Sequence, residues 1–162
     1  MKSLKSIATL CALAAAIALS PSVSLAQTVV QGQTQVVEKV EIKELDTKTF
    51  DAELKNSKLP VLVDFTAAWC GPCQMLKPKL EQLAQEFKGK VIFTKVEQTR
   101  NPSLIGQNGV RAFPTVKMYA PGGKEMSTSV GNVSLKDLRD WIQAQVDAND
   151  KAQSAQPQNQ KP

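Results

Sequence analysis

Hydrophobic and polar positions along the middle of the chain follow two periods, one typical of β-strands and one typical of α-helices. Alternating or continuously apolar runs predict five strands, at residues 40–45, 60–66, 90–97, 114–120 and 124–130. The run at 60–66 is almost entirely apolar, which is typical of a central strand covered on both faces. The turn sequence Pro-Gly-Gly at 121–123 joins the last two strands into a hairpin.

Four helices are predicted between and after these strands. The first is capped by Asp46 or Thr47, and a short one begins at Asn101 and Pro102. The longest internal helix ends at Gly89, and its apolar stripe is Leu76, Leu80, Leu83 and Phe87. The last begins at Ser134, with a stripe at Leu135, Leu138, Ile142 and Val146. The order β-α-β-α-β-α-β-β-α predicts an α/β fold, a mixed sheet with helices on both faces.

The N-terminal 26 residues have the pattern of a secretory signal peptide. Lys2 and Lys5 precede an apolar run at residues 7–19, and Ser-Leu-Ala at 24–26 forms a cleavage site before Gln27. The alternative is an uncleaved membrane anchor, but the run has 13 residues, and a span needs about 20. Cys11 follows Leu10 within this run, so lipid attachment is not expected. We therefore expect an exported protein without stable membrane insertion after cleavage.

Composition divides the remaining chain into a lead, one domain and a tail. Residues 27–39 are rich in Gln and Thr and predict a flexible lead, whereas residues 40–147 supply the core of one domain. The tail at 148–162 has almost no large apolar residue, so we expect it to be disordered. The net charge of +5 becomes +3 without Lys2 and Lys5, which is an ordinary surface balance and indicates no nucleic-acid partner.

The candidate chemistry lies in two cysteines. The chain has no histidine, which excludes Ser-His-Asp and Cys-His catalysis. Cys70 and Cys73 stand one turn apart at the predicted start of a helix, close enough for a disulfide, and the helix N-terminus favours a thiolate. We expect Cys70 to be exposed and Cys73 shielded, so that Cys70 attacks a partner disulfide and Cys73 resolves the mixed disulfide. Gly71 leaves the sulfur approachable, and Pro72 lacks an N–H where that donor would be unpaired anyway.

A C-x-x-C pair has three other interpretations: a zinc site, a haem attachment site and a structural disulfide. A structural zinc site needs four ligands, and the mature chain offers two cysteines and no histidine. Covalent haem needs a histidine where Gln74 stands. A purely structural disulfide stays open, although closing so short a loop removes little entropy from the unfolded chain. We therefore expect neither a metal nor a cofactor.

Asp64 is the one acid in the predicted central strand. A carboxylate inside a covered strand is costly unless it is neutral or paired. Six residues before Cys70, it can lie behind the cysteine pair and exchange a proton with Cys73. Lys95, on the next strand, can approach and tune it. From the pattern alone, a solvent-facing Asp64 and a solvated Lys95 stay open as alternatives.

At these residues the chain resembles the thioredoxin family. The resemblance rests on DFTAAWCGPC, on Phe-Pro-Thr at 113–115 and on Val-Gly-Asn at 130–132, and covers about residues 40–146 in the right order. It implies Cys70 as nucleophile, Cys73 as resolving cysteine, Asp64 as buried acid and Lys95 as its neighbour. It also implies a cis bond before Pro114. The groove for the partner's chain would be lined by Trp69, Gly71, Pro72, Phe113 and Gly131.

The chain departs from the family pattern at three positions. Thr66 replaces the aromatic residue usual in cytosolic thioredoxins, and Gln74 replaces a frequent basic residue. Phe113 is bulkier than the usual aliphatic residue before the cis-proline. These changes alter the groove, so the identity of the substrate cannot be carried over from the family. The central strand–helix unit holds no sizeable insertion, which argues against the cytochrome-maturation subtype.

The expected function combines the export signal with this chemistry. Gly-Pro between the cysteines resembles the reducing members of the family, so we expect a monomeric periplasmic reductase of protein disulfides. Such a reductase needs a membrane protein to supply its electrons. An oxidase or isomerase of periplasmic thiols is the alternative enzyme. A redox-inert adaptor or chaperone-like binder that uses only the groove is the alternative from another class.

Overall fold

The computed structural model describes residues 40–155. The predicted signal peptide at 1–26, the predicted lead at 27–39 and the last seven residues of the predicted tail lie outside these described residues. The strands are β1 (Lys43–Glu44), β2 (Val61–Thr66), β3 (Ile92–Glu97), β4 (Thr115–Tyr119) and β5 (Glu125–Val130). The helices are α1 (Phe50–Asn56), α2 (Gly71–Glu86), α3 (Pro102–Gln107) and α4 (Leu135–Ser154).

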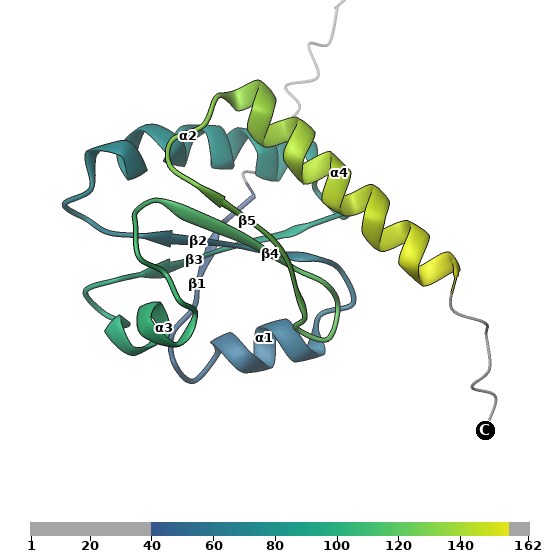
Figure 1. Cartoon of the computed structure of the whole chain (residues 1–162), viewed down its shortest axis with the longest axis horizontal. Helices are drawn as coiled ribbons and strands as arrows, with labels where there is room; N and C mark the ends of the chain where they lie inside the picture. The colour runs from purple at the N-terminus through teal and green to yellow at the C-terminus, as the bar shows by residue number, and fades with distance from the viewer. Residues whose placement is uncertain (1–39, 156–162) are drawn as a thin grey trace, which may run out of the picture. The chain divides into compact units, whose positions relative to one another are not determined.

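The five described strands form one mixed sheet in the order β1-β3-β2-β4-β5. β3 is parallel to β1 and β2, whereas β4 is antiparallel to both β2 and β5. Helices α2 and α4 cover one face of the sheet, and α1 and α3 cover the other (Figure 1). The predicted α/β class and the predicted order of elements are confirmed.

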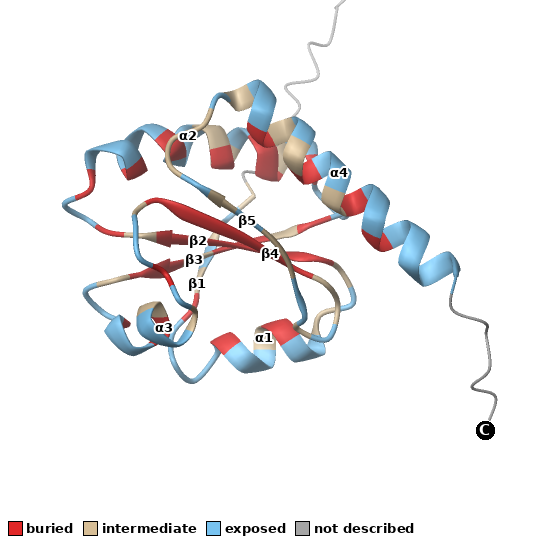
Figure 2. Ribbon diagram, in the orientation of Figure 1, coloured by how far each residue is buried: buried red, intermediate tan, exposed pale blue. Residues whose placement is uncertain are grey.

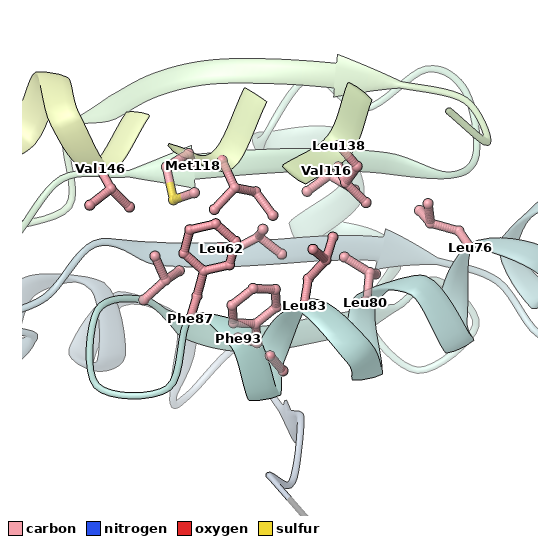
Figure 3. Packing of buried hydrophobic residues seen from close by; sticks show 13 residues of the cluster. Leu62, Leu76, Leu80, Leu83, Phe87, Phe93, Val116, Met118, Leu138 and Val146 are labelled. Carbon is pink, nitrogen blue, oxygen red and sulfur yellow. The ribbon is translucent and has the colours of Figure 1, made fainter. Parts of the chain in front are cut away.

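β2 lies at the centre of the sheet, and its side chains divide between two cores. Leu62 packs among side chains of α2 and α4, and Figure 3 shows it between Val116, Met118 and the helix leucines. Val61, Val63 and Phe65 point to the opposite face, toward α1 and α3. β2 is buried along most of its length (Figure 2), as predicted for a covered central strand. Asp64 follows Leu62 by two residues and therefore shares the face that α2 covers.

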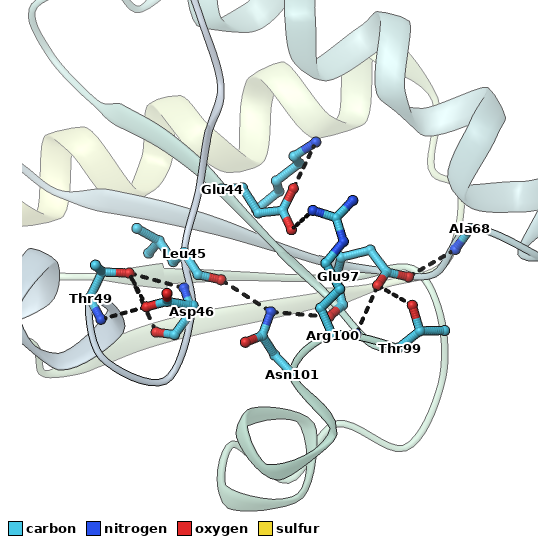
Figure 4. A network of polar contacts seen from close by, with 10 residues as sticks. Glu44, Leu45, Asp46, Thr49, Ala68, Glu97, Thr99, Arg100 and Asn101 are labelled. Carbon is cyan, nitrogen blue, oxygen red and sulfur yellow. Dashed lines mark hydrogen bonds and ion pairs between the residues drawn. The ribbon is translucent and has the colours of Figure 1, made fainter.

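The structure places one predicted helix start differently, and at a second it confirms the start but not the capping bond. Asp46 does not begin α1; its carboxylate accepts hydrogen bonds from the backbone and hydroxyl of Thr49 at 2.8 and 2.7 Å, and the helix begins after that turn. Asn101 precedes Pro102 as predicted but makes no capping bond. Its amide instead donates to the carbonyls of Leu45 and Glu97, which joins the segment after β1 to the end of β3 (Figure 4).

The C-terminal helix is longer than predicted. Ser134 caps α4 as expected, since its hydroxyl accepts the backbone N–H of Asp137 at 3.1 Å. The prediction of a disordered tail from residue 148 is wrong for residues 148–154, because α4 continues to Ser154. Buried Val146 anchors the helix, Asn149 beyond it is also buried, and the good helix formers Lys151, Ala152 and Gln153 lie in its last turn. Within residues 40–155, none of the helices combines the length and hydrophobicity of a membrane span.

Candidate active site

Cys70 and Cys73 form a disulfide at the start of α2, with their Cα atoms 5.3 Å apart. Cys70 is the N-cap residue, and its Sγ accepts the backbone N–H of Cys73 at 3.2 Å. The same N–H would stabilise negative charge on that sulfur after reduction. Because this donor points at Cys70, the geometry favours Cys70 as the thiolate of the pair.

The expected difference in exposure between the two cysteines is not found. Cys70 is 4% exposed and Cys73 is 2% exposed, so the prediction of an exposed Cys70 is wrong in this disulfide form. Ala67 and Phe113 pack against the two cysteines and cover them. Sequence spacing placed Cys70 outside the first turn correctly, but it could not show the side chains that close over it. The N-cap hydrogen bond therefore distinguishes the cysteines better than access does.

An apolar rim borders the disulfide. Trp69 is 69% exposed, and its ring meets that of Phe113 edge-on, with centroids 5.9 Å apart. The Phe113–Pro114 bond is cis, as the resemblance implied. Gly131, at a φ of 91°, donates its N–H to the carbonyl of Pro114 at 2.8 Å. The predicted groove residues Trp69, Phe113, Pro114 and Gly131 are thus joined by contacts, and Gly71 and Pro72 lie exposed at the start of α2.

Two exposed apolar residues near this rim were not predicted. Val130, the residue before Gly131, is 56% exposed, and Met75, on the second turn of α2, is 55% exposed. Together with Trp69 they are the large hydrophobic side chains that the described domain leaves open. Val130 fits the alternation of β5 and Met75 fits the helical pattern of α2, so neither stood out in the sequence.

Asp64 lies buried on β2, with 6% of its surface exposed. Its Oδ1 atom has no hydrogen-bond partner in the described structure. Burial raises the pKa of Asp64 to about 7, against the opposing attraction of Lys95. The expected burial is therefore confirmed over the solvent-facing alternative, whereas the role in proton transfer stays a prediction.

Lys95 lies opposite Asp64 in the register of β2 and β3. Its ammonium group forms an ion pair with Glu44 at 3.5 Å, and Arg100 donates to the same carboxylate at 2.7 Å (Figure 4). Lys95 is thus a neighbour of Asp64, as predicted, and acts on it through its charge. Part of that charge is balanced by Glu44, which sequence reasoning did not find.

Asp64 reaches a cavity of about 560 Å³ that is lined by β2, β3, α2 and residues 40–42, the segment before β1. Thr66 lines this cavity in place of the larger aromatic residue. Gln74 and Lys77 also line it, and they are the next residue and the next turn after Cys73 on α2. Asp64 therefore shares a solvent-accessible space with the part of α2 that carries Cys73.

The loop before Cys70 is held by two side chains that bond to the backbone N–H and C=O of one residue, Ala68. Glu97 accepts the N–H of Ala68 at 3.2 Å, and Gln74 donates to the carbonyl of Ala68 at 3.3 Å. Glu97 is nearly buried and also accepts hydrogen bonds from the Thr99 hydroxyl and the Arg100 backbone (Figure 4). These bonds, that from Thr99 foremost, hold the pKa of Glu97 below its ordinary value. Sequence reasoning missed Glu97, because its partners come from two separate loops.

Comparison with known proteins identifies the family to which the chain belongs. The family model described as Thioredoxin matches residues 39–144, about two thirds of the chain. The chain belongs to the thioredoxin family. It is similar to a thioredoxin of Rickettsia felis, with 39% identity over 98 residues that cover 60% of this chain and 92% of the relative. It is also similar to thioredoxin 2 of Chlorobaculum tepidum, with 46% identity over 103 residues that cover 61% of this chain and 94% of that protein.

Family membership and the Cys70–Cys73 pair together establish the class of reaction. As a thioredoxin-family protein, the chain is a thiol-disulfide oxidoreductase, and thioredoxins act on protein disulfides. The purely structural interpretation of the disulfide is thereby set aside. Within residues 40–155, no group of three carboxylate or cysteine side chains is placed to hold a metal ion.

Proposed function

We propose that this protein is an exported thioredoxin that reduces disulfides of periplasmic proteins. The observation that carries the proposal is the placement of Cys70, whose sulfur accepts the N–H of Cys73 at a helix N-terminus inside an exposed apolar rim. A thiolate favoured there can attack a disulfide of a chain that lies against Trp69 and Phe113. The signal-peptide pattern of residues 1–26 supports the compartment.

The proposed reaction moves two electrons and two protons to the substrate. The Cys70 thiolate attacks one substrate sulfur, which forms a mixed disulfide and releases the other substrate sulfur as a thiolate that takes up a proton. The Cys73 thiol then loses its proton and attacks the Cys70 sulfur. This step forms the Cys70–Cys73 disulfide and releases the second substrate sulfur, which is protonated in turn. The substrate leaves as a dithiol.

Asp64 is proposed as the acceptor of the Cys73 proton. A carboxyl group whose pKa lies near 7 is present in both forms at neutral pH, which suits it to general base catalysis. The chain has no histidine to serve instead. The positive charge of Lys95 opposes the effect of burial, so it keeps part of the Asp64 population ionised. The cavity beside Asp64 lets the proton leave to solvent.

Turnover in this compartment needs an electron donor. Each cycle leaves the protein as the disulfide, and its reduction takes two electrons. Periplasmic disulfide chemistry is controlled by membrane systems rather than by a thiol buffer. We therefore propose a membrane protein with a reactive dithiol as the donor, which would meet the same rim in the same orientation as a substrate. We propose that the protein itself acts as a monomer.

The reduction potential tests the direction of electron flow. We expect a value of about −270 mV, typical of a reducing thioredoxin, together with catalysis of insulin reduction. Equilibration of the purified protein with glutathione and dithiothreitol series measures the potential. A value above about −180 mV would support the oxidase or isomerase instead. If the protein has the potential of a reducing thioredoxin but exchanges disulfides with no protein substrate, the result would support the redox-inert adaptor.

Export is tested by the mature N-terminus. When the full-length chain is expressed in a Gram-negative bacterium, we expect it in the periplasmic fraction with Gln27 as its first residue, measured by intact mass. The Lys2→Glu, Lys5→Glu variant removes the positive region. It should accumulate in the cytoplasm as the uncleaved chain, whose first residue is Met1 or, after removal of that methionine, residue 2. A wild-type chain of uncleaved mass in the membrane fraction would indicate an anchor.

A further inference from the structure

The loop between β5 and α4 forms the side of the groove next to Pro114. It comprises residues 131–133 and leads from exposed Val130 to the cap of α4 at Ser134. Its first residue, Gly131, donates to the carbonyl of Pro114 at 2.8 Å, and the N–H of Val133 donates back to the Gly131 carbonyl at 3.1 Å. Residues 131–133 belong to no helix or strand, so their position depends on such individual bonds.

A lysine of the redox helix holds this loop. The Nζ of Lys79 donates to the side-chain oxygen of Asn132 at 2.7 Å and to the backbone carbonyl of Val133 at 2.6 Å. Both bonds are short and charge-assisted, and they lie in a partly buried position. Lys79 stands six residues after Cys73 on α2, whereas its partners follow more than 50 residues later. The helix that carries the cysteines is thus tied directly to one wall of the groove.

We propose that Lys79 is a positioning residue for the partner's chain, acting through its bonds to Asn132 and Val133. The tie holds the Val130–Gly131 wall at a set place relative to Cys70 before a partner binds. Without it, the partner must order the loop on binding, and this ordering cost weakens affinity. Cys70 itself is placed by the start of α2, so its reaction with a small disulfide does not depend on the tie. The proposal rests on the groove described under Proposed function.

The test separates binding from chemistry. Reduced protein is mixed with excess insulin in single-turnover stopped-flow experiments, which give a half-saturating concentration and a maximal rate. Lys79→Met keeps the length of the side chain but removes the ammonium group, and Asn132→Ala removes one acceptor. Lys136→Met is the matched control, because Lys136 is an exposed lysine close to the loop whose ion pair is with Asp140 on its own helix. The initial rate of reaction with 5,5′-dithiobis(2-nitrobenzoate), a small disulfide, reports on the attack of Cys70 without a protein partner.

We expect Lys79→Met to raise the half-saturating insulin concentration on the order of fivefold, the value of one ordinary hydrogen bond. The maximal rate and the small-disulfide rate should stay within about twofold of wild type, and Lys136→Met should match wild type throughout. Lys79→Arg keeps the charged donors and should recover most of the affinity. In the double variant Lys79→Met, Asn132→Ala, the loss of affinity should be smaller than the sum of the two single losses. Both changes break the same Lys79–Asn132 hydrogen bond.

Two results would overturn the proposal. An unchanged half-saturating concentration with a lowered melting temperature would make Lys79 purely structural. An equal fall in the insulin and small-disulfide rates would mean that Lys79 acts on Cys70 rather than on the groove. If wild-type protein fails to reduce insulin, the reductase direction is wrong, and the same comparison is made with oxidised protein and a dithiol peptide. The groove binds the partner in either direction, so the effect of Lys79→Met should persist.

Discussion

Replacing Cys70 by serine should abolish disulfide exchange with protein substrates. The serine hydroxyl has no sulfur to enter a mixed disulfide, and Cys73, at 2% exposure, lacks the hydrogen bond that Cys70 receives from the helix N-terminus. Insulin reduction in the presence of dithiothreitol measures the loss against the uncatalysed rate. A Cys70→Ser protein that keeps substantial activity would show that Cys73 attacks substrates.

The Cys73→Ser variant should behave in the opposite way and retain partners as mixed disulfides. Cys70 can still attack, but nothing resolves the product. Non-reducing electrophoresis of extracts, with and without dithiothreitol, measures the trapped species, and Cys70→Ser is the control that should trap none. Because the two cysteines are almost equally buried as the disulfide, alkylation of the reduced protein is a sharp test of their order. Iodoacetamide should modify Cys70 first, and prior modification of Cys73 would reverse the roles.

Much of the fold was predictable because the strongest patterns in this sequence are local. The apolar run of β2 and the helical stripe of α2 each bury their own face, so period and length indicate both element and orientation. The same holds for α4, whose stripe and Ser134 cap were both found. Predictions failed where a helix end depends on other contacts, as at Asp46 and beyond residue 147.

The site was predictable in its chemistry and less so in its surroundings. Cys70, Cys73 and Asp64 are recognisable because few residue types can perform their steps. Glu97 and Lys79 are not, since a glutamate at a strand end and a lysine on a helix normally face solvent. Their partners, Ala68 and Asn132, are brought to them only by the folded sheet. The burial of Cys70 under Phe113 has the same origin, a contact between residues 43 positions apart.

The stability of the protein should depend on pH through Asp64. Its folded-state pKa of about 7 exceeds the ordinary value of 3.8, so the folded state binds more protons than the unfolded state between these values. The contribution of Asp64 to stability should therefore fall as pH rises from about 4 to about 7 and stay level above. A shift of this size corresponds to on the order of 4 kcal/mol. The charged carboxylate is thus a cost to the fold at neutral and alkaline pH.

Asp64→Asn should remove most of this cost, because the amide has similar shape and no charge. Urea unfolding should show a gain of a few kcal/mol at pH 8 and little gain at pH 4. Asp51→Asn is the matched control, since Asp51 is an exposed carboxylate on α1 and its replacement should change stability by less than about 0.5 kcal/mol at either pH. A gain that is equal at both pH values would mean that the ionisation of Asp64 is not its source.

The same variant should react more slowly, which separates the cost of Asp64 from its use. In the wild-type protein the release of the reduced substrate should accelerate as pH rises through about 7, when Asp64 becomes able to accept the Cys73 proton. Asp64→Asn should lose this inflection and release substrate roughly 100-fold more slowly at pH 7.5, the lower end of the range for a general base. Single-turnover release of labelled insulin chains measures this step, and the attack of Cys70 on a small disulfide should change little.

A more stable Asp64→Asn protein with an unchanged pH profile would leave Asp64 buried but without a part in proton transfer. Slower release together with higher stability would show that the fold retains a destabilising carboxylate because the resolving step requires it.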